Sequence, residues 1–343
     1  MSADWLSLVE SSGGLLLAAF GAYALSLLIT WCWSWAAPRL GFLDRPGARR
    51  LHRSPVPRGG GIGIVLVSVL ALLHFQPLGK DSGSVALALL ALAGVGLYDD
   101  FKGAAIGLRL LIQLGAALAL AAAVLLDGER PMLLPLLIAI LLTAAWINVF
   151  NFMDGANGMA GQQAVFMAAV TMGFAALARE TSWVLYAMAL AGAVLGFLPF
   201  NVPRARVFLG DVGSTALAFA LAAPLVALVA SGHMSLPEVV LFASAFLVDT
   251  SATWIGRVSR GRGWYTAHRE HLYQWLVRSG YSHVQVAALY ASWNLLVVVP
   301  LLAAGRSMPA WQPLFALIGL VLGLGLWRFG RAHALARLRA QAR

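Results

Sequence analysis

The chain has 343 residues, of which 60% are hydrophobic and 11% charged, whereas a soluble domain carries about 25% charged residues. With a mean hydropathy of +0.81, this composition excludes a soluble globular domain and predicts a membrane protein. The single cysteine, Cys32, excludes a disulfide framework and a cysteine-based metal site. The net charge of +10 would suit nucleic acid, but in a bilayer protein excess arginine marks cytoplasmic loops and anionic substrates, so we expect no nucleic-acid partner.

Apolar stretches between charged or Gly/Pro-rich breaks predict about 11 transmembrane helices, since a helix needs about 20 apolar residues to cross a bilayer. We predict them at 13–36, 61–78, 84–98, 110–126, 132–150, 160–178, 183–200, 213–231, 236–255, 284–304 and 312–328. The third stretch is short, so we expect its helix to continue through Asp99. The sequence therefore predicts an all-α polytopic integral membrane protein.

The basic residues predict its orientation. The first stretch follows Asp4 and Glu10 instead of a basic leader, so we interpret it as a spanning helix with an outer N-terminus and not as a cleavable signal. All but four of the 24 Lys and Arg residues then lie in cytoplasmic segments. The positive-inside rule thus predicts a periplasmic N-terminus and a cytoplasmic C-terminus.

Polar and ionisable residues collect in five of the predicted cytoplasmic loops. Such residues are costly near a membrane and indicate function. No segment is long enough for a soluble domain, and no internal repeat is visible. We therefore expect residues 1–343 to form a single transmembrane catalytic domain with its active site in loops at about 37–60, 99–109, 148–160, 201–214 and 256–283.

The first loop carries Arg49, His52 and Arg58 and ends in a glycine run at 59–61. Prolines stiffen this loop and glycines allow close approach of the backbone. We interpret it as a phosphate-binding loop. The alternative is a basic loop that lies near lipid headgroups.

The second cluster, Asp99 and Asp100 followed by Lys102, ends an apolar helix. Two adjacent carboxylates repel each other, and a nearby Mg²⁺ or a cation such as Lys102 offsets that cost. The alternative is an acidic pair that only decorates the membrane interface. Arg109 and Gln113 follow on the next helix.

The third cluster places Asn148, Asn151 and Asp154 at every third position, which on a helix keeps them within about a 120° arc. Gly155 and Gly158 then break the helix. Amide oxygens with one carboxylate suit a hard cation or a sugar nucleotide. An asparagine ladder between helices is the structural alternative.

The fourth cluster, FLGDVGS at 208–214, follows Arg204 and Arg206 and opens a helix. Free N–H groups and the dipole at a helix start favour an anion. The adjacent arginines strengthen the phosphate interpretation. Asp211 as a simple N-cap is the alternative.

The fifth cluster contains Arg257, His268, Arg269 and His271. Zinc is one interpretation of the histidine pair, but no cysteine and no compelling third ligand support it. Pyrophosphate binding fits the arginines better. We interpret Asp249, near the end of the preceding helix, as a packing residue or a supporting partner of these cations.

Together, NFMDG at 151–155, FLGDVGS at 208–214 and HREHLYQ at 268–274 make the chain resemble the polyprenyl-phosphate N-acetylhexosamine-1-phosphate transferases of glycosyltransferase family 4 type. The likeness spans nearly the whole chain and is strongest to the O-antigen initiating branch. It implies a bacterial inner-membrane enzyme that transfers a sugar-1-phosphate from a UDP-N-acetylhexosamine to polyprenyl (undecaprenyl) phosphate and releases UMP. The step would initiate O-antigen (lipopolysaccharide) or another cell-envelope glycan.

The resemblance also implies roles for residues. Asp211 with Asn151 would hold Mg²⁺ or Mn²⁺, and Asp99, Asp100 and Lys102 would form the reaction centre. Phe208 would stack on uracil, and His268 and Arg269 would hold the pyrophosphate. We expect further substrate contacts from Arg49, His52, Arg58, Asn148, Asp154, Asn157, Arg204, Arg257 and His271.

Two substrates and two chemical routes stay open. The phospho-MurNAc-pentapeptide translocase of peptidoglycan synthesis is the alternative enzyme, although its branch has an aspartate where this chain has Asn157 and a different, His-rich last motif. Asp99 would orient or deprotonate the lipid phosphate in a direct displacement, or an aspartate would form a covalent phosphoryl intermediate.

A transporter is the alternative of another class. It predicts ionisable residues at the bilayer midplane and paired repeats, and neither is visible. The prenyl tail would lie in an unidentified groove between helices in contact with membrane lipids, and a homodimer agrees with the family.

Overall fold

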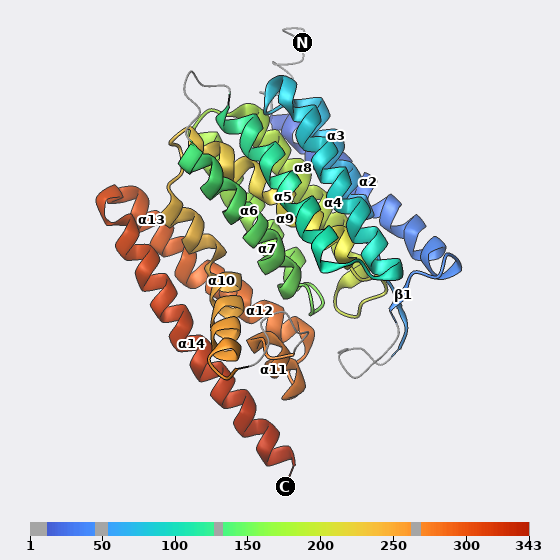
Figure 1. Ribbon diagram of the computed structural model, residues 1–343, viewed down its shortest axis with the longest axis vertical. Coiled ribbons are helices and arrows are strands. Elements are labelled where there is room, and N and C mark those ends of the chain that lie inside the picture. The colour runs from blue at the N-terminus through green and yellow to red at the C-terminus, as the bar shows by residue number, and fades with distance from the viewer. Residues whose placement is uncertain (1–11, 45–53, 127–132, 262–268, 343) are drawn as a thin grey trace. The chain divides into compact units, whose positions relative to one another are not determined.

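The computed structural model describes residues 12–44, 54–126, 133–261 and 269–342, and Figure 1 shows its helices in chain order. In this part of the chain the only strands are β1 (Leu43–Asp44) and β2 (Val56–Pro57), which pair antiparallel with Leu43 opposite Pro57. The rest of the regular structure is helical. The predicted all-α polytopic class is confirmed.

The earlier helices are α2 (Ser12–Arg39), α3 (Ile62–Phe75), the 3₁₀ turn η1 (Gly79–Asp81), α4 (Ser82–Lys102), α5 (Ile106–Leu125), α6 (Leu133–Met153), α7 (Met159–Leu177), α8 (Thr181–Asn201) and α9 (Gly210–Ala230). The later ones are α10 (Leu236–Val258), α11 (Leu272–Arg278), α12 (His283–Trp293), the π-helical η2 (Asn294–Val298), α13 (Val299–Ser307), the 3₁₀ turn η3 (Pro309–Trp311) and α14 (Gln312–Gln341).

Every predicted spanning stretch corresponds to a helical segment. Within the described residues, 10 segments are long and apolar enough to cross a membrane. The remaining stretch is α3, whose 14 residues end before Gln76, which has a positive φ of 44°. At about 1.5 Å per residue α3 is shorter than the hydrocarbon core. The expectation that the third helix passes Asp99 is confirmed, because α4 ends at Lys102. The orientation stays a prediction.

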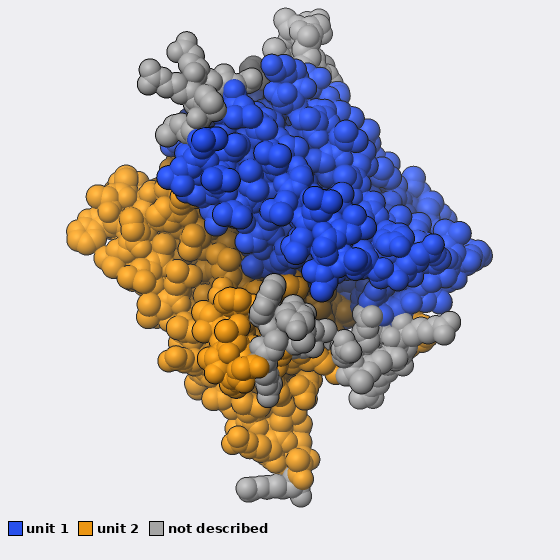
Figure 2. All heavy atoms as spheres, viewed as in Figure 1, with its two compact units in different colours: residues 1–44, 56–151, 164–234 blue, residues 45–55, 152–163, 235–343 orange. Residues whose placement is uncertain are grey.

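The chain forms two compact units, coloured blue and orange in Figure 2. Unit 1 comprises residues 1–44, 56–151 and 164–234, and unit 2 comprises 45–55, 152–163 and 235–343. The predicted loops at 99–109 and 201–214 belong to unit 1, and the loop at 256–283 belongs to unit 2. That one catalytic domain includes both units stays a prediction.

Helix α9 is the core of unit 1. In its apolar stretch 83% of the residues are buried, and it contacts α3, α4, α5 and α8. Lipid tails are as apolar as leucine, so helices in a bilayer associate by close packing, which small residues permit. Alanines fill much of α9, and Gly96 of α4 lies against the start of α9, where an added Cβ would come 2.5 Å from the carbonyl oxygen of Asp211. Close packing therefore sets the position of Asp211.

In unit 2, helix α14 packs on α10, α11 and α13. Helix α10 begins with a capping box, in which Ser235 and Glu238 satisfy each other's backbone N–H groups. A Cβ added at Gly319 of α14 would come 2.5 Å from a methyl carbon of Leu241. Unit 2 thus has a helical core of its own.

We expect Gly96→Ala to destabilise the protein by about 1–3 kcal/mol, because the added methyl overpacks the contact between α4 and α9. The matched control is Gly94→Ala in the same helix, where an added Cβ has no heavy atom within 4 Å. It should be neutral or stabilising by up to about 1 kcal/mol. Thermal unfolding in detergent measures both, and equal midpoints for the two variants would contradict this account.

Candidate active site

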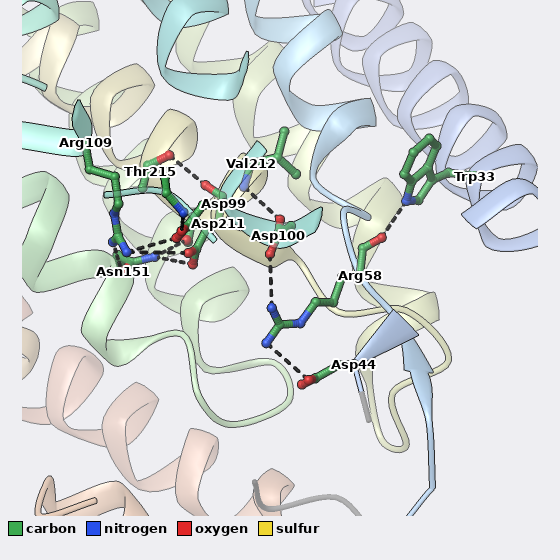
Figure 3. A network of polar contacts seen from close by, with 12 residues as sticks. Trp33, Asp44, Arg58, Asp99, Asp100, Arg109, Asn151, Asp211, Val212 and Thr215 are labelled. Carbon is green, nitrogen blue, oxygen red and sulfur yellow. Dashed lines mark hydrogen bonds and ion pairs between the residues drawn. The ribbon is translucent and has the colours of Figure 1, made fainter. Parts of the chain in front are cut away.

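Four helices of unit 1 bring predicted site residues together around Arg109 of α5 (Figure 3). The Nη1 atom of Arg109 donates to Asp99 Oδ2 at 2.9 Å and lies 3.9 Å from Asp211 Oδ2. Its Nη2 atom donates to Asn151 Oδ1 at 3.5 Å. One guanidinium therefore contacts an oxygen from each of three residues that are far apart in the sequence. We call Asp99, Arg109, Asn151 and Asp211 the acidic cluster.

The amide of Asn151 is oriented by two acceptors. Its Nδ2 donates to Asp211 Oδ1 at 2.8 Å and to Ser214 Oγ at 2.7 Å. Its oxygen is thereby directed to the Arg109 side. Helix α6 continues to Met153, so Asn148 lies nearly one turn before Asn151 and donates to Gln113 Oε1 at 2.7 Å. The predicted asparagine face of this helix is therefore directed into unit 1.

The two adjacent aspartates have different environments. Asp99 accepts the backbone N–H of Ala104 in addition to its bond with Arg109. The side chain of Asp100 is only 1% exposed and accepts the N–H of Val212 at 3.2 Å. A carboxylate at a helix N-terminus is stabilised by the helix dipole. Asp99 thus belongs to the acidic cluster, whereas Asp100 holds the start of α9.

Arg58 connects Asp100 to the β-hairpin. Its Nη1 lies 3.5 Å from Asp100 Oδ1 and its Nη2 lies 3.2 Å from Asp44 Oδ1. Its carbonyl oxygen accepts the indole N–H of Trp33 at 2.6 Å. Gly210, with φ +77°, has no room for a side chain, because an added Cβ would come 2.5 Å from Asp100 Oδ2. Arg58 therefore has a structural role in addition to the phosphate contact predicted for it.

The glycine run meets the FLGDVGS segment backbone to backbone. Gly60 and Gly61 donate their N–H groups to the carbonyls of Phe208 and Leu209 at 2.8 and 3.0 Å. A Cβ added at Gly61 would come 2.2 Å from the Cα of Gly213. The glycines thus allow two loops to touch, and those two N–H groups are already used by protein carbonyls.

The remaining predicted site residues have no tested role. Lys102 is exposed, with its Nζ 5.9 Å from the Phe101 ring centroid. Arg204 is exposed and Phe208 is partly buried. Arg49, His52 and His268 lie outside the described residues. The roles predicted for all of these residues stay predictions.

Sequence reasoning omitted Arg109, Gln113 and Ser214 from the site. Arg109 and Gln113 are four residues apart, which places them on one face of α5. That face receives Asn148 and Asn151, which are three apart on α6. These two spacings, each of which places a pair of polar residues on one face of a helix, were visible in the sequence. Only the tertiary structure shows that the two faces contact each other.

In unit 2, the third and fifth motifs contact each other. Tyr273 Oη donates to the carbonyl oxygen of Phe152 at 3.1 Å. An added Cβ at Gly155 would overlap Tyr273 Oη, so this position requires glycine. The backbone N–H of Asn157 donates to His283 Nδ1 at 3.0 Å. The segment with Asp154 and Asn157 is therefore held by the segment that follows His271.

The arginines of the fifth motif have acidic and basic neighbours. Arg257, which is 4% exposed, contacts Glu270 Oε1 at 2.6 Å, and Arg260 contacts Glu270 Oε2 at 2.8 Å. Burial lowers the pKa of Arg269, and the positive charge of Arg278 acts in the same direction. An anion beside Arg269 would relieve both effects. Arg257 is therefore paired with a carboxylate of its own motif, and the pyrophosphate contact of Arg269 stays a prediction.

Asp249 is the hub of unit 2. It is 1% exposed and accepts the N–H of Leu272 at 2.8 Å, the hydroxyl of Tyr290 at 2.7 Å and the indole N–H of Trp327 at 3.0 Å. His271 Nδ1 lies 3.7 Å away. One carboxylate thus joins α10, α11, α12 and α14, in agreement with the predicted packing role.

Known proteins are similar in sequence to this chain. The glycosyl transferase family 4 model matches residues 82–229, a segment that contains the whole acidic cluster. A phospho-N-acetylmuramoyl-pentapeptide-transferase of Symbiobacterium thermophilum is 32% identical over 299 residues, which cover 76% of this chain and 86% of that protein. The chain belongs to the polyprenyl-phosphate N-acetylhexosamine-1-phosphate transferase family. It is therefore an enzyme of the polyprenyl-phosphate phosphotransferase type and a multi-pass membrane protein.

Two further relatives are named as transferases of N-acetylglucosamine phosphate. A decaprenyl-phosphate N-acetylglucosaminephosphotransferase of Mycobacterium tuberculosis (strain CDC 1551 / Oshkosh) is 29% identical over 305 residues, with 75% of this chain and 74% of that protein covered. An undecaprenyl-phosphate alpha-N-acetylglucosaminyl 1-phosphate transferase of Yersinia pestis is 27% identical over 324 residues, with 86% and 87% covered.

We expect Asp249→Asn to destabilise this transferase by about 2–3 kcal/mol. The amide NH₂ group is a donor, so it would leave some of the donors that now bind the carboxylate without an acceptor. The matched control is the neighbouring Thr250→Val, since the buried Thr250 Oγ1 has no hydrogen-bond partner among the described residues. This control should change stability by less than about 1 kcal/mol. Equal unfolding midpoints for the two variants in detergent would rule out the hub role.

Proposed function

We propose that this protein transfers an N-acetylhexosamine-1-phosphate from a UDP-sugar to polyprenyl phosphate and releases UMP. The observation that carries the proposal is the acidic cluster, in which Asp99, Asn151 and Asp211 from different helices all contact the guanidinium of Arg109. The names of the relatives, which are polyprenyl-phosphate sugar phosphotransferases, support the same reaction. Both substrates are phosphate anions, and the guanidinium of Arg109, which lies between Asp99 and Asp211, is a cation that can bind them.

We further propose that Asp211 and Asn151 hold Mg²⁺ or Mn²⁺, with Asp99 beside them. Hard cations prefer oxygen ligands, and Mg²⁺ is usually held by one or two carboxylates together with substrate phosphates. The donors fit this description, because oxygens of all three residues already surround one positively charged group. Across the described residues, no three His, Cys, Asp or Glu side chains form a metal site by themselves. This agrees with an ion that takes its remaining ligands from substrate and water.

Two residues of the chain have tasks in the reaction. An oxygen of the polyprenyl phosphate attacks the β-phosphorus of the UDP-sugar, the new O–P bond forms, and the bond from that phosphorus to the departing UMP breaks. Arg109 offsets the repulsion between the two anions in a site of low dielectric constant. Asp99 orients the lipid phosphate or accepts its residual proton. The bound divalent ion would supply further neutralisation of phosphate charge.

Side-chain geometry favours direct displacement over a covalent aspartyl-phosphate. Both carboxylate oxygens of Asp99 already have donors, Ala104 N and Arg109 Nη1. Asp100 is 1% exposed and is bonded to Val212 N and Arg58. A nucleophile has to be aimed at phosphorus, and these hydrogen bonds hold both carboxylates in their present orientations.

We assign the donor to the O-antigen initiating branch and expect the site to face the cytoplasm of the bacterial inner membrane. NFMDG, FLGDVGS and HREHLYQ support that branch, as does Asn157, where peptidoglycan enzymes have an aspartate. The 32% identity to a phospho-N-acetylmuramoyl-pentapeptide-transferase keeps the peptidoglycan donor as the second candidate.

We expect purified protein to release UMP from a UDP-N-acetylhexosamine only when polyprenyl phosphate and Mg²⁺ are both present. UDP-MurNAc-pentapeptide should not replace this donor. Asp211→Ala should lower turnover by at least about 100-fold, since it removes charge stabilisation at the reacting phosphates. It should also abolish Mn²⁺ binding followed by electron paramagnetic resonance.

The matched control for this test is Asp81→Ala at the opposite end of the same spanning segment as Asp99, where the Asp81 side chain makes no cap hydrogen bond. It should leave both turnover and Mn²⁺ binding unchanged. Normal turnover of Asp211→Ala at limiting Mg²⁺ would refute the metal assignment.

We also expect no exchange of labelled UMP into UDP-sugar when polyprenyl phosphate is omitted, because direct displacement forms no phosphoryl enzyme. Exchange should appear once the product polyprenyl-diphosphate-sugar is supplied, since the reaction then runs in reverse. Rapid exchange with UDP-sugar and UMP alone would establish the covalent route instead. Asp211→Ala serves as the inactive reference.

A further inference from the structure

A cavity of about 380 Å³ lies inside unit 2, among α10, α11, α12 and α14. This volume falls within the range of about 300–1,000 Å³ that is usual for small-molecule sites. Its walls are mainly apolar and include Leu272, Leu276, Leu289 and Leu326 together with aromatic side chains. Residues between 323 and 333 of α14, the long red helix in Figure 1, line the cavity.

The polar groups in the cavity wall are used by the protein itself. Asp249 accepts hydrogen bonds from Tyr290 and Trp327, and Ser244 Oγ accepts the indole N–H of Trp293 at 3.0 Å. These groups therefore have little to offer a polar ligand, and the inner part of any ligand must be apolar. A hydrocarbon chain meets this requirement.

The rim of the cavity is aromatic and basic. Tyr281 Oη and His333 Nε2 are 3.1 Å apart, and the guanidinium carbon of Arg337 lies 4.8 Å from the Tyr281 ring centroid. Arg331 lies over Trp327 at 5.4 Å, and its buried Nε has no hydrogen-bond partner among the described residues. Tyrosine, tryptophan and arginine are typical of the level of lipid headgroups.

The part of the chain that supplies this rim carries charge of one sign. The sequence from His271 to Arg343 contains no Asp or Glu, and its charged residues are all arginines. Basic pockets between transmembrane helices bind the headgroups of anionic lipids. We propose that the cavity binds an acyl chain of an anionic diacyl phospholipid, with the lipid phosphate held by His333 and Arg337. This site is independent of the acidic cluster and of the proposed reaction.

The test uses the full chain in a neutral detergent with phosphatidylglycerol or phosphatidylcholine of identical acyl chains. Phosphatidylglycerol should raise the unfolding temperature by several degrees and remain bound in native mass spectrometry, whereas phosphatidylcholine should do neither. Arg337→Gln should weaken this binding about fivefold, the usual effect of one arginine near an anionic lipid. Arg337 is exposed, so the variant should fold normally.

The matched control is Arg339→Gln, which removes the same charge from the same helix at an exposed position away from the cavity lining. It should change binding by less than about twofold. Ala245→Phe, which fills part of the cavity, should weaken the binding of phosphatidylglycerol without altering the basic rim.

Three results would overturn the proposal. The first is equal binding of phosphatidylcholine, which would leave no role for the basic rim. The second is an equal effect of Arg337→Gln and Arg339→Gln. The third is displacement of phosphatidylglycerol by equimolar polyprenyl phosphate, because the cavity would then be the groove of the acceptor substrate. Turnover in neutral detergent should be the same for Arg337→Gln and the unmodified protein.

Discussion

Charge balance around Arg109 is the interaction on which unit 1 depends. Asp99 and Asp211 carry like charges at the ends of helices that cross a membrane, where uncompensated charge is costly. The guanidinium contacts both carboxylates and the amide oxygen of Asn151, so one cation offsets the repulsion and links α4, α5, α6 and α9. The same balance makes the cluster suitable for phosphates, because cations and carboxylates are already arranged in a partly buried place. Stability and chemistry here have one electrostatic origin.

Close backbone approach is the second requirement. Gly61 lies against Gly213, and Gly96 lies against the carbonyl of Asp211, so the acidic residue at the start of α9 is fixed by contacts that any side chain would obstruct. Asp100 completes this arrangement by accepting the N–H of Val212. The glycine run, which the sequence suggested as a phosphate loop, therefore contributes by positioning the carboxylate. Unit 2 uses a different device, a single buried aspartate, Asp249, that receives donors from several helices.

Much of this architecture and part of the site could be predicted. The apolar stretches marked every long helix because the hydrocarbon thickness dictates their length and composition, whereas the short α11 lies in a segment predicted as a loop. Polar residues are costly near a membrane, and for that reason the sequence analysis selected Asp99, Asn151 and Asp211. The structure brings these three residues together. Arg109 was not selected, since a basic residue in a predicted cytoplasmic loop is also explained by the positive-inside rule. Asp99 and Asp100 were treated as one pair, although neighbours on a helix point about 100° apart and face different partners.

The sequence by itself determined the membrane class, the number of helical stretches and the residues whose burial would be unfavourable without partners. These properties follow from composition and local periodicity, which need no knowledge of distant contacts. Tertiary structure alone decided which cation meets which carboxylate, that Arg257 belongs to Glu270, and that an apolar cavity opens beneath a basic rim in unit 2. Such pairings depend on how helices pack, and packing depends on the shapes of side chains far apart in the chain, for which a linear pattern holds no direct signal.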